Sequence, residues 1–275
     1  MLRRKIVSTL GGSCLLAATA ALQVPAAHAI PIVVTGISGT WTAANTSPAG
    51  GVTGLGTSTI SWGIPFDQPE PEQQSSYVFV ADAVPTAELD PESPFGLGTF
   101  THNNFQIQRP FLDNAELTVT LTLDILDGPG GIVLATEVIN SVFDFTHLET
   151  PNNNNPIDPT EICPDGNFNG TPPNTNGCAD RVTFETSALT ETFEVGDERY
   201  FFELVGFCST CPSEGEEPSI VSEFWTVEND VNDAVLVAQY RVVVEELPAP
   251  GAAWLLVSGL AALGASRGRR RTLRS

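Results

Sequence analysis

Residues 115–125 alternate between apolar and polar side chains. Leu117, Val119, Leu121, Leu123 and Ile125 are separated by threonines or an aspartate at every second position. Successive side chains of a β-strand point to opposite faces of the sheet. This period of two therefore predicts a strand with one apolar face and one face toward water.

Further strands are expected along the middle of the chain. The candidates are residues 32–37, 59–62, 77–81, 132–139, 142–147, 181–185, 191–195, 200–207, 221–227 and 234–244. Turn-forming clusters separate several of them, for example the Asp-Gly-Pro-Gly-Gly sequence at 127–131. No sustained helical period interrupts this pattern. Many short strands joined by Gly- and Pro-rich turns predict an all-β fold, an antiparallel, jelly-roll-like β-sandwich.

The first 29 residues are typical of a secretory signal peptide. Basic residues at 3–5 precede an apolar run over 10–21, and Ala27 and Ala29 form a small-x-small cleavage motif. We expect signal peptidase to cut after Ala29, so that the exported domain begins near Ile30.

The last 29 residues have the layout of a sorting signal. A proline-containing motif with Pro248 and Pro250 is followed by an apolar run over 252–265 and five arginines between 267 and 274. As a helix, the run would extend about 21 Å at 1.5 Å per residue. A bilayer core is about 30 Å thick, so only transient membrane association is expected. The arginines are expected to stay cytoplasmic.

Each end has an alternative interpretation. The N-terminal segment is also compatible with a membrane helix, although its apolar run is short and Pro25 follows it. Lipidation at Cys14 is disfavoured because Leu10 lies one position too far from it. For the C-terminal run, the alternative is a buried helix, which would leave five arginines behind a helix with no polar face.

Residues 30–246 are expected to form one domain with a strong acidic excess. All 33 acidic residues lie between Asp67 and Glu246, against four arginines in the same domain, which leaves a charge of −29. Such a charge argues against nucleic acid or anionic lipid as a partner. It favours solubility, divalent cations or a high-salt environment, and solubility alone is the simplest explanation.

The exported domain would contain four cysteines once Cys14 is removed. They are Cys163, Cys178, Cys208 and Cys211. An even number in an oxidising compartment predicts two disulfides, with three pairings open. We expect Cys163–Cys178, because that pair brackets a loop. The Cys208-x-x-Cys211 pair follows a predicted strand and precedes an acidic loop, so a structural role is favoured over a redox or zinc site.

A long Asn-, Pro- and Gly-rich loop over 150–179 contains a candidate calcium site. Its sequence at 165–170, Asp-Gly-Asn-Phe-Asn-Gly, matches the opening of a calcium loop, and calcium prefers oxygen ligands. The twelfth position is Asn176 where an EF-hand has glutamate, which excludes an EF-hand. The candidate ligands of a looser site are Asp165, Asn167, Asn169 and Asp180. The alternative is a polar turn held by a disulfide, with no cofactor.

Two Phe-Thr-His sequences, at 100–102 and 145–147, form a weak internal echo. His102 and His147, with Glu149 nearby in sequence, have the side chains of a metal or acid–base site. We favour two strand-end histidines that bond to loops. A separation of the two rings beyond about 8 Å would exclude a shared metal.

Tryptophans at 41, 62 and 225 are candidates for stacking on sugars, although core positions are expected. The sequence contains no nucleophilic serine elbow and no phosphate-binding glycine loop, and acidic residues are too abundant for chance carboxylate pairs to carry weight. We therefore expect a protein that is not an enzyme.

Five segments carry a resemblance to a known family. They are 56–63, 76–79, 97–105 with Thr101, His102 and Asn103, 176–180, and 224–229. In this order they resemble the THxN family of PEP-CTERM proteins, which have a choice-of-anchor K domain. The tail sequence Leu-Pro-Ala-Pro at 247–250 is similar to the VPLPA-like variants. Gln106 departs from the proline common after the motif.

The resemblance implies export and processing by an exosortase- or archaeosortase-type protease that cuts near residues 248–251. The protein would be tethered to the inner membrane until processed, and then reach the cell surface or extracellular matrix. A structural or binding role beside extracellular polysaccharide is implied, and no reaction. The alternative is a secreted carbohydrate-binding protein or carbohydrate-active enzyme on the same scaffold.

Overall fold

A computed structural model describes residues 30–66, 73–85, 87–150, 158–184, 192–196, 198–208 and 219–244. Nearly all of their regular structure is β-strand, and the paired strands are antiparallel, which confirms the predicted all-β class. The expected signal helix (1–29) and sorting helix (within 247–275) lie outside the described residues. Within the described ranges, no helix is long and apolar enough to cross a membrane.

Two large sheets form the body of the molecule. The first sheet has the order β1-β7-β8-β9-β13 and consists of Ile32–Ser47, Phe111–Leu126, Val133–Leu148, Asp180–Phe184 and Glu223–Thr226. The second has the order β10-β11-β14-β5-β4-β2 and consists of Thr192–Val195, Glu198–Cys208, Asp230–Val244, Phe95–Asn104, Ser75–Ala81 and Thr59–Trp62. Short strand β12 (Ile220–Val221) pairs with β11, and β3 (Ile64–Pro65) pairs with β6 (Ile107–Gln108).

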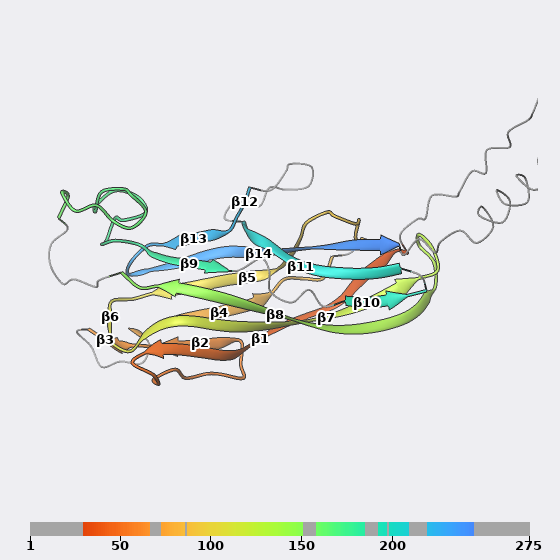
Figure 1. The fold of residues 1–275 in the computed structure, drawn as a ribbon, viewed down its shortest axis with the longest axis horizontal. Helices are drawn as coiled ribbons and strands as arrows, with labels where there is room; N and C mark the ends of the chain where they lie inside the picture. The colour runs from red at the N-terminus through yellow and green to blue at the C-terminus, as the bar shows by residue number, and fades with distance from the viewer. Residues whose placement is uncertain are drawn as a thin grey trace, which may run out of the picture.

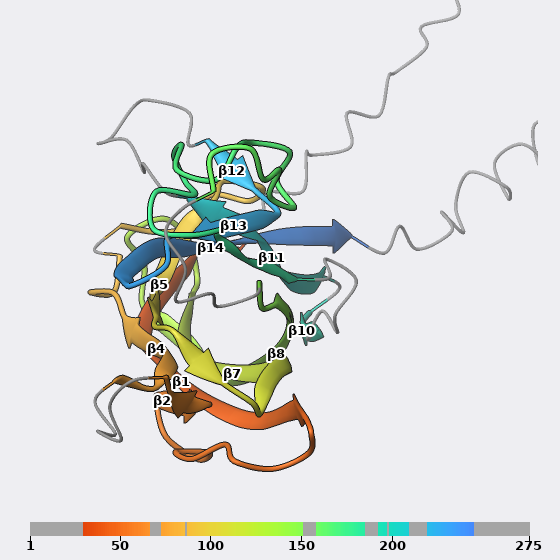
Figure 2. The ribbon, with the colours of Figure 1, turned by 90° about the vertical axis from the view of Figure 1, so that its left-hand side faces the viewer.

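The long strands run along the length of an elongated body (Figure 1). Viewed from one end, the sheets curl around a common interior (Figure 2). The predicted alternation is found in β7, where Leu117, Val119 and Leu121 are buried and the threonines between them are half-buried. The apolar face of β7 therefore joins a core to which both sheets contribute.

Close packing between the sheets depends on glycine. Phe79 of β4 lies against Gly39 of β1, where an added Cβ would come 2.2 Å from the Phe79 ring. Gly98 of β5 flanks the same ring, and its Cβ would come 2.7 Å from it. The Phe79 ring of the second sheet thus occupies the space that a side chain at Gly39 of the first sheet would need.

Several details of the strand prediction were wrong: β1 continues to Ser47, and the short strands β3 and β6 were not expected. Strand β5 (Phe95–Asn104) was not expected, because Gly96, Gly98 and two asparagines weaken its strand pattern. The two segments predicted at 132–139 and 142–147 belong to a single strand, β8 (Val133–Leu148), which curves around the interior (Figure 2). Residues 221–227 are divided: β12 pairs with β11 in the second sheet, and β13 pairs with β9 in the first.

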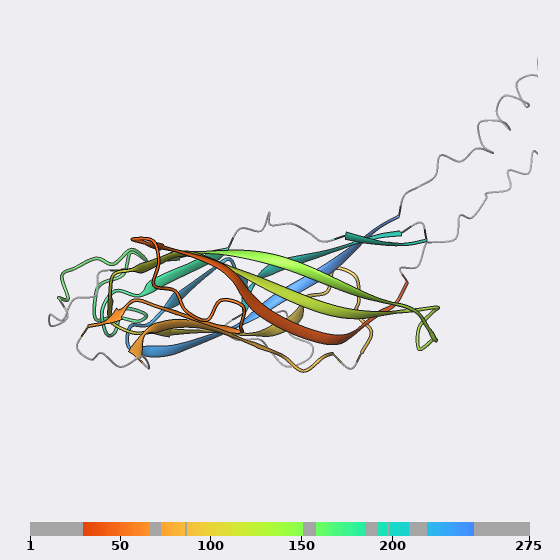
Figure 3. The ribbon, with the colours of Figure 1, turned by 90° about the horizontal axis from the view of Figure 1, so that it is seen from below.

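The two ends of the described body lie together. The backbone nitrogen of Ile30 donates to the Glu198 carboxylate at 3.2 Å, and Glu198 pairs with Val244 at the end of β14. Strand β14 extends from there over 15 residues, about 45 Å, to Asp230, which pairs with Asn104. We call the end near Asp230 the distal end. Residues 158–179 lie there as well, opposite the end where β1 begins and β14 ends (Figure 3).

Candidate functional site

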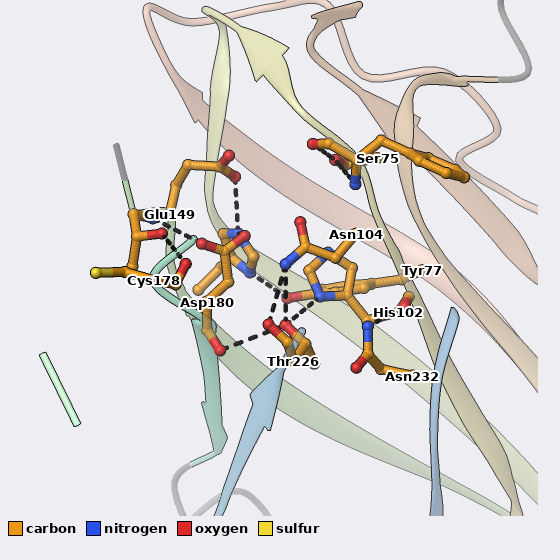
Figure 4. Close-up of polar contacts among 12 residues, drawn as sticks. Ser75, Tyr77, His102, Asn104, Glu149, Cys178, Asp180, Thr226 and Asn232 are labelled. Atoms are coloured by element: carbon orange, nitrogen blue, oxygen red, sulfur yellow. Dashed lines mark hydrogen bonds and ion pairs between the residues drawn. The ribbon is translucent and has the colours of Figure 1, made fainter. Parts of the chain in front are cut away.

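A group of polar side chains is buried between the two sheets at the distal end (Figure 4). The second sheet contributes Tyr77, His102 and Asn104, and the first contributes His147, Asp180 and Thr226, with Glu149 and Glu228 just beyond β8 and β13. We call these eight residues the polar cluster. Their side chains are almost entirely removed from solvent, and even the Glu149 side chain is only 4% exposed. Buried polar groups are costly unless they are paired, so each one needs a partner.

The internal echo of the sequence explains how the two histidines meet. In each Phe-Thr-His segment the phenylalanine and the histidine are two residues apart, so both point to the same face of their strand. Phe100 of β5 stacks on Phe145 of β8 with ring centroids 5.4 Å apart. Beside this pair, the rings of His102 and His147 lie 5.2 Å apart. Both histidines lie near the ends of their strands, and His147 bonds to Glu149 just beyond β8, as expected. His102 differs from the expectation, since it bonds to Thr226 of strand β13, and both rings are buried between the sheets.

His102 is held by Thr226. The Thr226 hydroxyl donates to the backbone carbonyl of Asp180 at 3.3 Å and lies 2.9 Å from Nδ1 of His102. A Thr226 hydroxyl that donates to Asp180 accepts from His102, and in that arrangement Nδ1 carries the ring proton. The other nitrogen, Nε2, is then an acceptor, and it is buried without a hydrogen-bond partner. Burial lowers the pKa of His102 well below its ordinary value, and the neighbouring His147 acts in the same direction.

His147 connects the sheets and reaches two carboxylates. Its Nδ1 lies 2.6 Å from the Tyr77 hydroxyl, and its Nε2 lies 3.1 Å from Glu149 and 3.8 Å from Oδ2 of Asp180. Burial lowers the pKa of His147, while Asp180 and Asp113 oppose the shift. The ring is therefore held neutral beside two acids.

The carboxylates of the cluster lack enough partners. Oδ1 of Asp180 accepts from the backbone nitrogen of Thr150 at 2.7 Å, but Oδ2 has no hydrogen bond. Both side-chain oxygens of Glu228 are buried without one. Burial, together with Asp180 and Glu149, raises the pKa of Glu228 to about 10, and the neighbouring Asn104 side chain opposes this shift. Burial and Glu149 likewise raise the pKa of Asp180 well above its ordinary value.

Donor atoms of the cluster form two overlapping sets. Within the described part of the chain, one set of potential metal ligands is His102, His147 and Asp180, and a second is Glu149, Asp180 and Glu228; the atoms of each set lie within 4.8 Å of one another. The two sets share Asp180. Two imidazoles and three carboxylates are the side chains that bind first-row transition metals in proteins. The sequence had indicated the histidines, but it had not indicated Glu228.

The predicted calcium ligands do not form one group. Asp180 lies in the polar cluster, whereas Asp165 and Asn167 are joined by a 2.8 Å hydrogen bond in the loop at 158–179. The Asp165 carboxylate also accepts from the Asn174 amide at 3.0 Å, and Asn169 donates to Glu161. Amide N–H groups therefore surround Asp165. Calcium binding by the loop residues stays a prediction.

The predicted disulfide between Cys163 and Cys178 is confirmed. It fastens the loop next to the polar cluster, since the Thr150 hydroxyl donates to the carbonyl of Cys178 at 2.6 Å. Cys208 is buried and also disulfide-bonded, and Cys211 lies outside the described residues.

Of the three tryptophans, Trp41 and Trp62 are fully buried, as expected for core residues. Trp225 is half-buried, and the Arg181 guanidinium lies 5.5 Å from its ring centre. The predicted processing residues Ala27, Ala29, Pro248 and Pro250 lie outside the described residues.

An open depression of about 630 Å³ borders the cluster. Its lining includes the aromatic residues Phe66 and Phe111, the cation Arg109, and Glu149 and Thr150 at the edge of the cluster. Glu149 is thus both a wall of the depression and a partner of His147.

No protein-family model matches the chain, and no curated protein sequence matches it. The structure nevertheless relates the five segments that resemble the THxN family. Each segment supplies at least one residue in or against the polar cluster. In chain order these residues are Trp62, Tyr77, His102 with Asn104, Asp180, and Thr226 with Glu228. Trp62 is outside the cluster itself and stacks on His102. Thr101 and Asn103 of the same motif bond elsewhere, to Asp233 and Ser76.

Proposed function

We propose that this chain is an exported cell-surface or extracellular-matrix protein with a structural or binding role, and that it is not an enzyme. The observation that carries the proposal is the Cys163–Cys178 disulfide in a strongly acidic all-β domain. Disulfides persist in oxidising compartments outside the cytoplasm. The domain is proposed to be a jelly-roll-like β-sandwich, delivered by its signal peptide and processed at its tail.

The arrangement of the two ends supports a tethered intermediate. Ile30 and Val244 lie together at one end of the body, so a membrane-associated tail would hold the domain by that end. The polar cluster and the disulfide loop would then project about 45 Å away from the membrane. A binding surface at the distal end is accessible both before and after the tail is cut.

The second candidate is a secreted carbohydrate-binding protein or carbohydrate-active enzyme. The depression lined by Phe66, Phe111 and Arg109 favours this alternative, because aromatic rings and a cation suit an acidic sugar. Trp41 and Trp62 do not support it, since both are buried in the core.

Expression of the full chain in a bacterium that contains an exosortase-type protease tests the export proposal. We expect a surface or extracellular product that begins near Ile30, ends near residues 248–251, and contains oxidised cysteines. Replacement of Pro248 and Pro250 by alanine should retain the longer, membrane-associated form. A cytoplasmic product with reduced cysteines would contradict the proposal. A glycan-array and hydrolysis screen of the same product separates the alternatives, since hydrolysis would establish an enzyme.

A further inference from the structure

We infer that the polar cluster binds one divalent transition-metal ion, with His102, His147, Asp180, Glu149 and Glu228 as its ligands. Zn²⁺ is the representative ion of this class. The ion would join the two sheets, because His102 lies on β5 of the second sheet while His147 and Asp180 lie on β8 and β9 of the first. The inference is independent of export and of the role at the cell surface.

The first argument is the set of unpaired atoms. Nε2 of His102, Oδ2 of Asp180 and both side-chain oxygens of Glu228 are buried and lack hydrogen bonds. With the two acids ionised, all of these atoms offer lone pairs to a cation. Each such atom removed from water costs free energy, and several together repel one another unless a cation lies among them. Of the four arginines in the described ranges, Arg181, Arg199 and Arg241 form ion pairs with Glu223, Glu194 and Glu203. The fourth, Arg109, lies in the lining of the depression together with Glu149.

The second argument is the orientation of the imidazoles. Metal-binding histidines usually donate the N–H of one ring nitrogen to a neighbour and bind the metal through the other. Nδ1 of His102 is bonded to Thr226, so Nε2 is the ring nitrogen left without a partner. In His147 the Tyr77 hydroxyl occupies the same position beside Nδ1, and Nε2 faces Glu149 and Asp180.

The third argument is distance. Two ligands at about 2.1 Å from one metal lie at most about 4.2 Å apart. Nε2 of His147 is 3.1 Å from the Glu149 carboxylate and 3.8 Å from that of Asp180, which satisfies this limit. Within each set, the remaining atoms lie within 4.8 Å of one another, so the widest pair in a set needs to close by at most about 0.6 Å. Binding of all five ligands to one ion requires the two sets, which share Asp180, to close on the same point.

The ligand types select the class of ion. Imidazole nitrogen suits zinc, iron, copper, nickel or cobalt, whereas calcium and magnesium prefer oxygen alone. Two histidines therefore favour a transition metal at this position over the calcium that the loop sequence suggested. Glu149 lies between His147 and the open depression, which provides a path for the ion to enter.

Metal binding by the purified full chain tests the inference directly. After treatment with a chelator, the chain is equilibrated with Zn²⁺ or Ca²⁺ alone, and bound metal is measured by elemental analysis. We expect one Zn²⁺ per chain and no comparable calcium binding at this site. Asp180→Asn removes the ligand common to both sets, and Glu228→Gln removes an unpaired acid. Both should weaken zinc binding by more than the roughly 10–100-fold that loss of an outer partner costs.

Ser141→Ala is the matched control, because Oγ of Ser141 is also buried and unpaired but lies outside the cluster. This variant should keep full zinc affinity. Nitrogen-15 NMR of the histidines in the unmodified chain provides a readout that requires no variant. Of the three histidines, only His102 and His147 should shift their Nε2 resonances on addition of zinc, and His28 should not. Three results would each overturn the inference: the unmodified chain binds no zinc, the ring resonances do not change, or folded Asp180→Asn binds zinc as tightly as the unmodified chain. The buried acids of the cluster would then be neutralised by protons alone.

Discussion

The hydroxyl of Tyr77 lies 2.6 Å from Nδ1 of His147, and this contact joins β4 of the second sheet to β8 of the first. Both side chains are fully buried. Burial and the nearby Asp180 and Glu149 raise the pKa of Tyr77 well above its ordinary value, so the phenol stays neutral. The contact is therefore a neutral hydrogen bond in the interior, and its loss leaves a buried ring nitrogen unpaired.

Tyr77→Phe should lower the free energy of unfolding by about 1–3 kcal/mol, because it removes one partner of a buried hydrogen bond and keeps the ring. If the cluster binds zinc, the variant should also lose about 10–100-fold in affinity, since Tyr77 orients a ligand. Urea titration and zinc titration measure the two effects separately.

Tyr240→Phe is the control for this change. Its hydroxyl donates to the carbonyl of Leu89 at 2.8 Å, and it packs beside Tyr200, away from the polar cluster. We expect a similar loss of stability and unchanged zinc affinity. Equal losses of zinc affinity in both variants would mean that Tyr77 acts only through global stability.

The disulfide near the cluster gives a second prediction. Cys163 and Cys178 are separated by 15 residues, and a loop of that length predicts a stabilisation of about 3 kcal/mol. The Cys163→Ser/Cys178→Ser variant should therefore unfold at a lower urea concentration. Replacing these two cysteines leaves the disulfide of Cys208 intact. A reducing agent would break both disulfides and could not separate their effects. An unchanged urea midpoint would show that residues 158–179 are held by their hydrogen bonds instead.

Much of the fold was predictable because its signals are local. The period of two in β7 and the turn at 127–131 identify a hairpin, and the cysteine spacing suggested the correct disulfide. Strand β5 was missed because its buried positions include a glycine, Gly98, which is a weak strand former. Gly98 lacks a side chain because the Phe79 ring of the neighbouring strand β4 packs against it. The sequence of β5 alone does not contain that contact.

The polar cluster was predictable only in part, because its residues come from distant positions. The Phe-Thr-His echo indicated His102 and His147, since the same residues recur at the same strand spacing. Asp180 was assigned to a calcium loop and Glu228 was not considered, because acidic residues are too common in this chain to stand out. Two of the five family-like segments, 176–180 and 224–229, contain Asp180 and Glu228. The sequence does not show that these segments lie side by side, because that contact forms only when β9 and β13 pair in the first sheet.

Packing between the sheets gives a third prediction. Gly39→Ala places a methyl group against the Phe79 ring, where an ideal Cβ would lie 2.2 Å from the nearest ring atom. Overpacking of this kind costs about 1–3 kcal/mol. Gly128→Ala, in a turn with no atom within 4 Å of the added carbon, is the control and should change stability little. Equal midpoints of thermal unfolding in the two variants would show that the sheets can separate freely at Phe79.

Metal removal connects the cluster to the stability of the whole domain. A ligand that binds only the folded state stabilises it by about 2.7 kcal/mol at 100 times its dissociation constant. For a domain of this size, that corresponds to an increase in Tm of about 5–10 °C. Calorimetric scans of the unmodified chain with zinc and with a chelator should show this difference. Ser141→Ala should show the same increase, and Glu228→Gln a much smaller one. Because zinc would bridge His102 and His147 from opposite sheets, its effect should appear in the cooperative unfolding of both sheets. An increase confined to a separate early transition would place the ion on the loop at 158–179 instead.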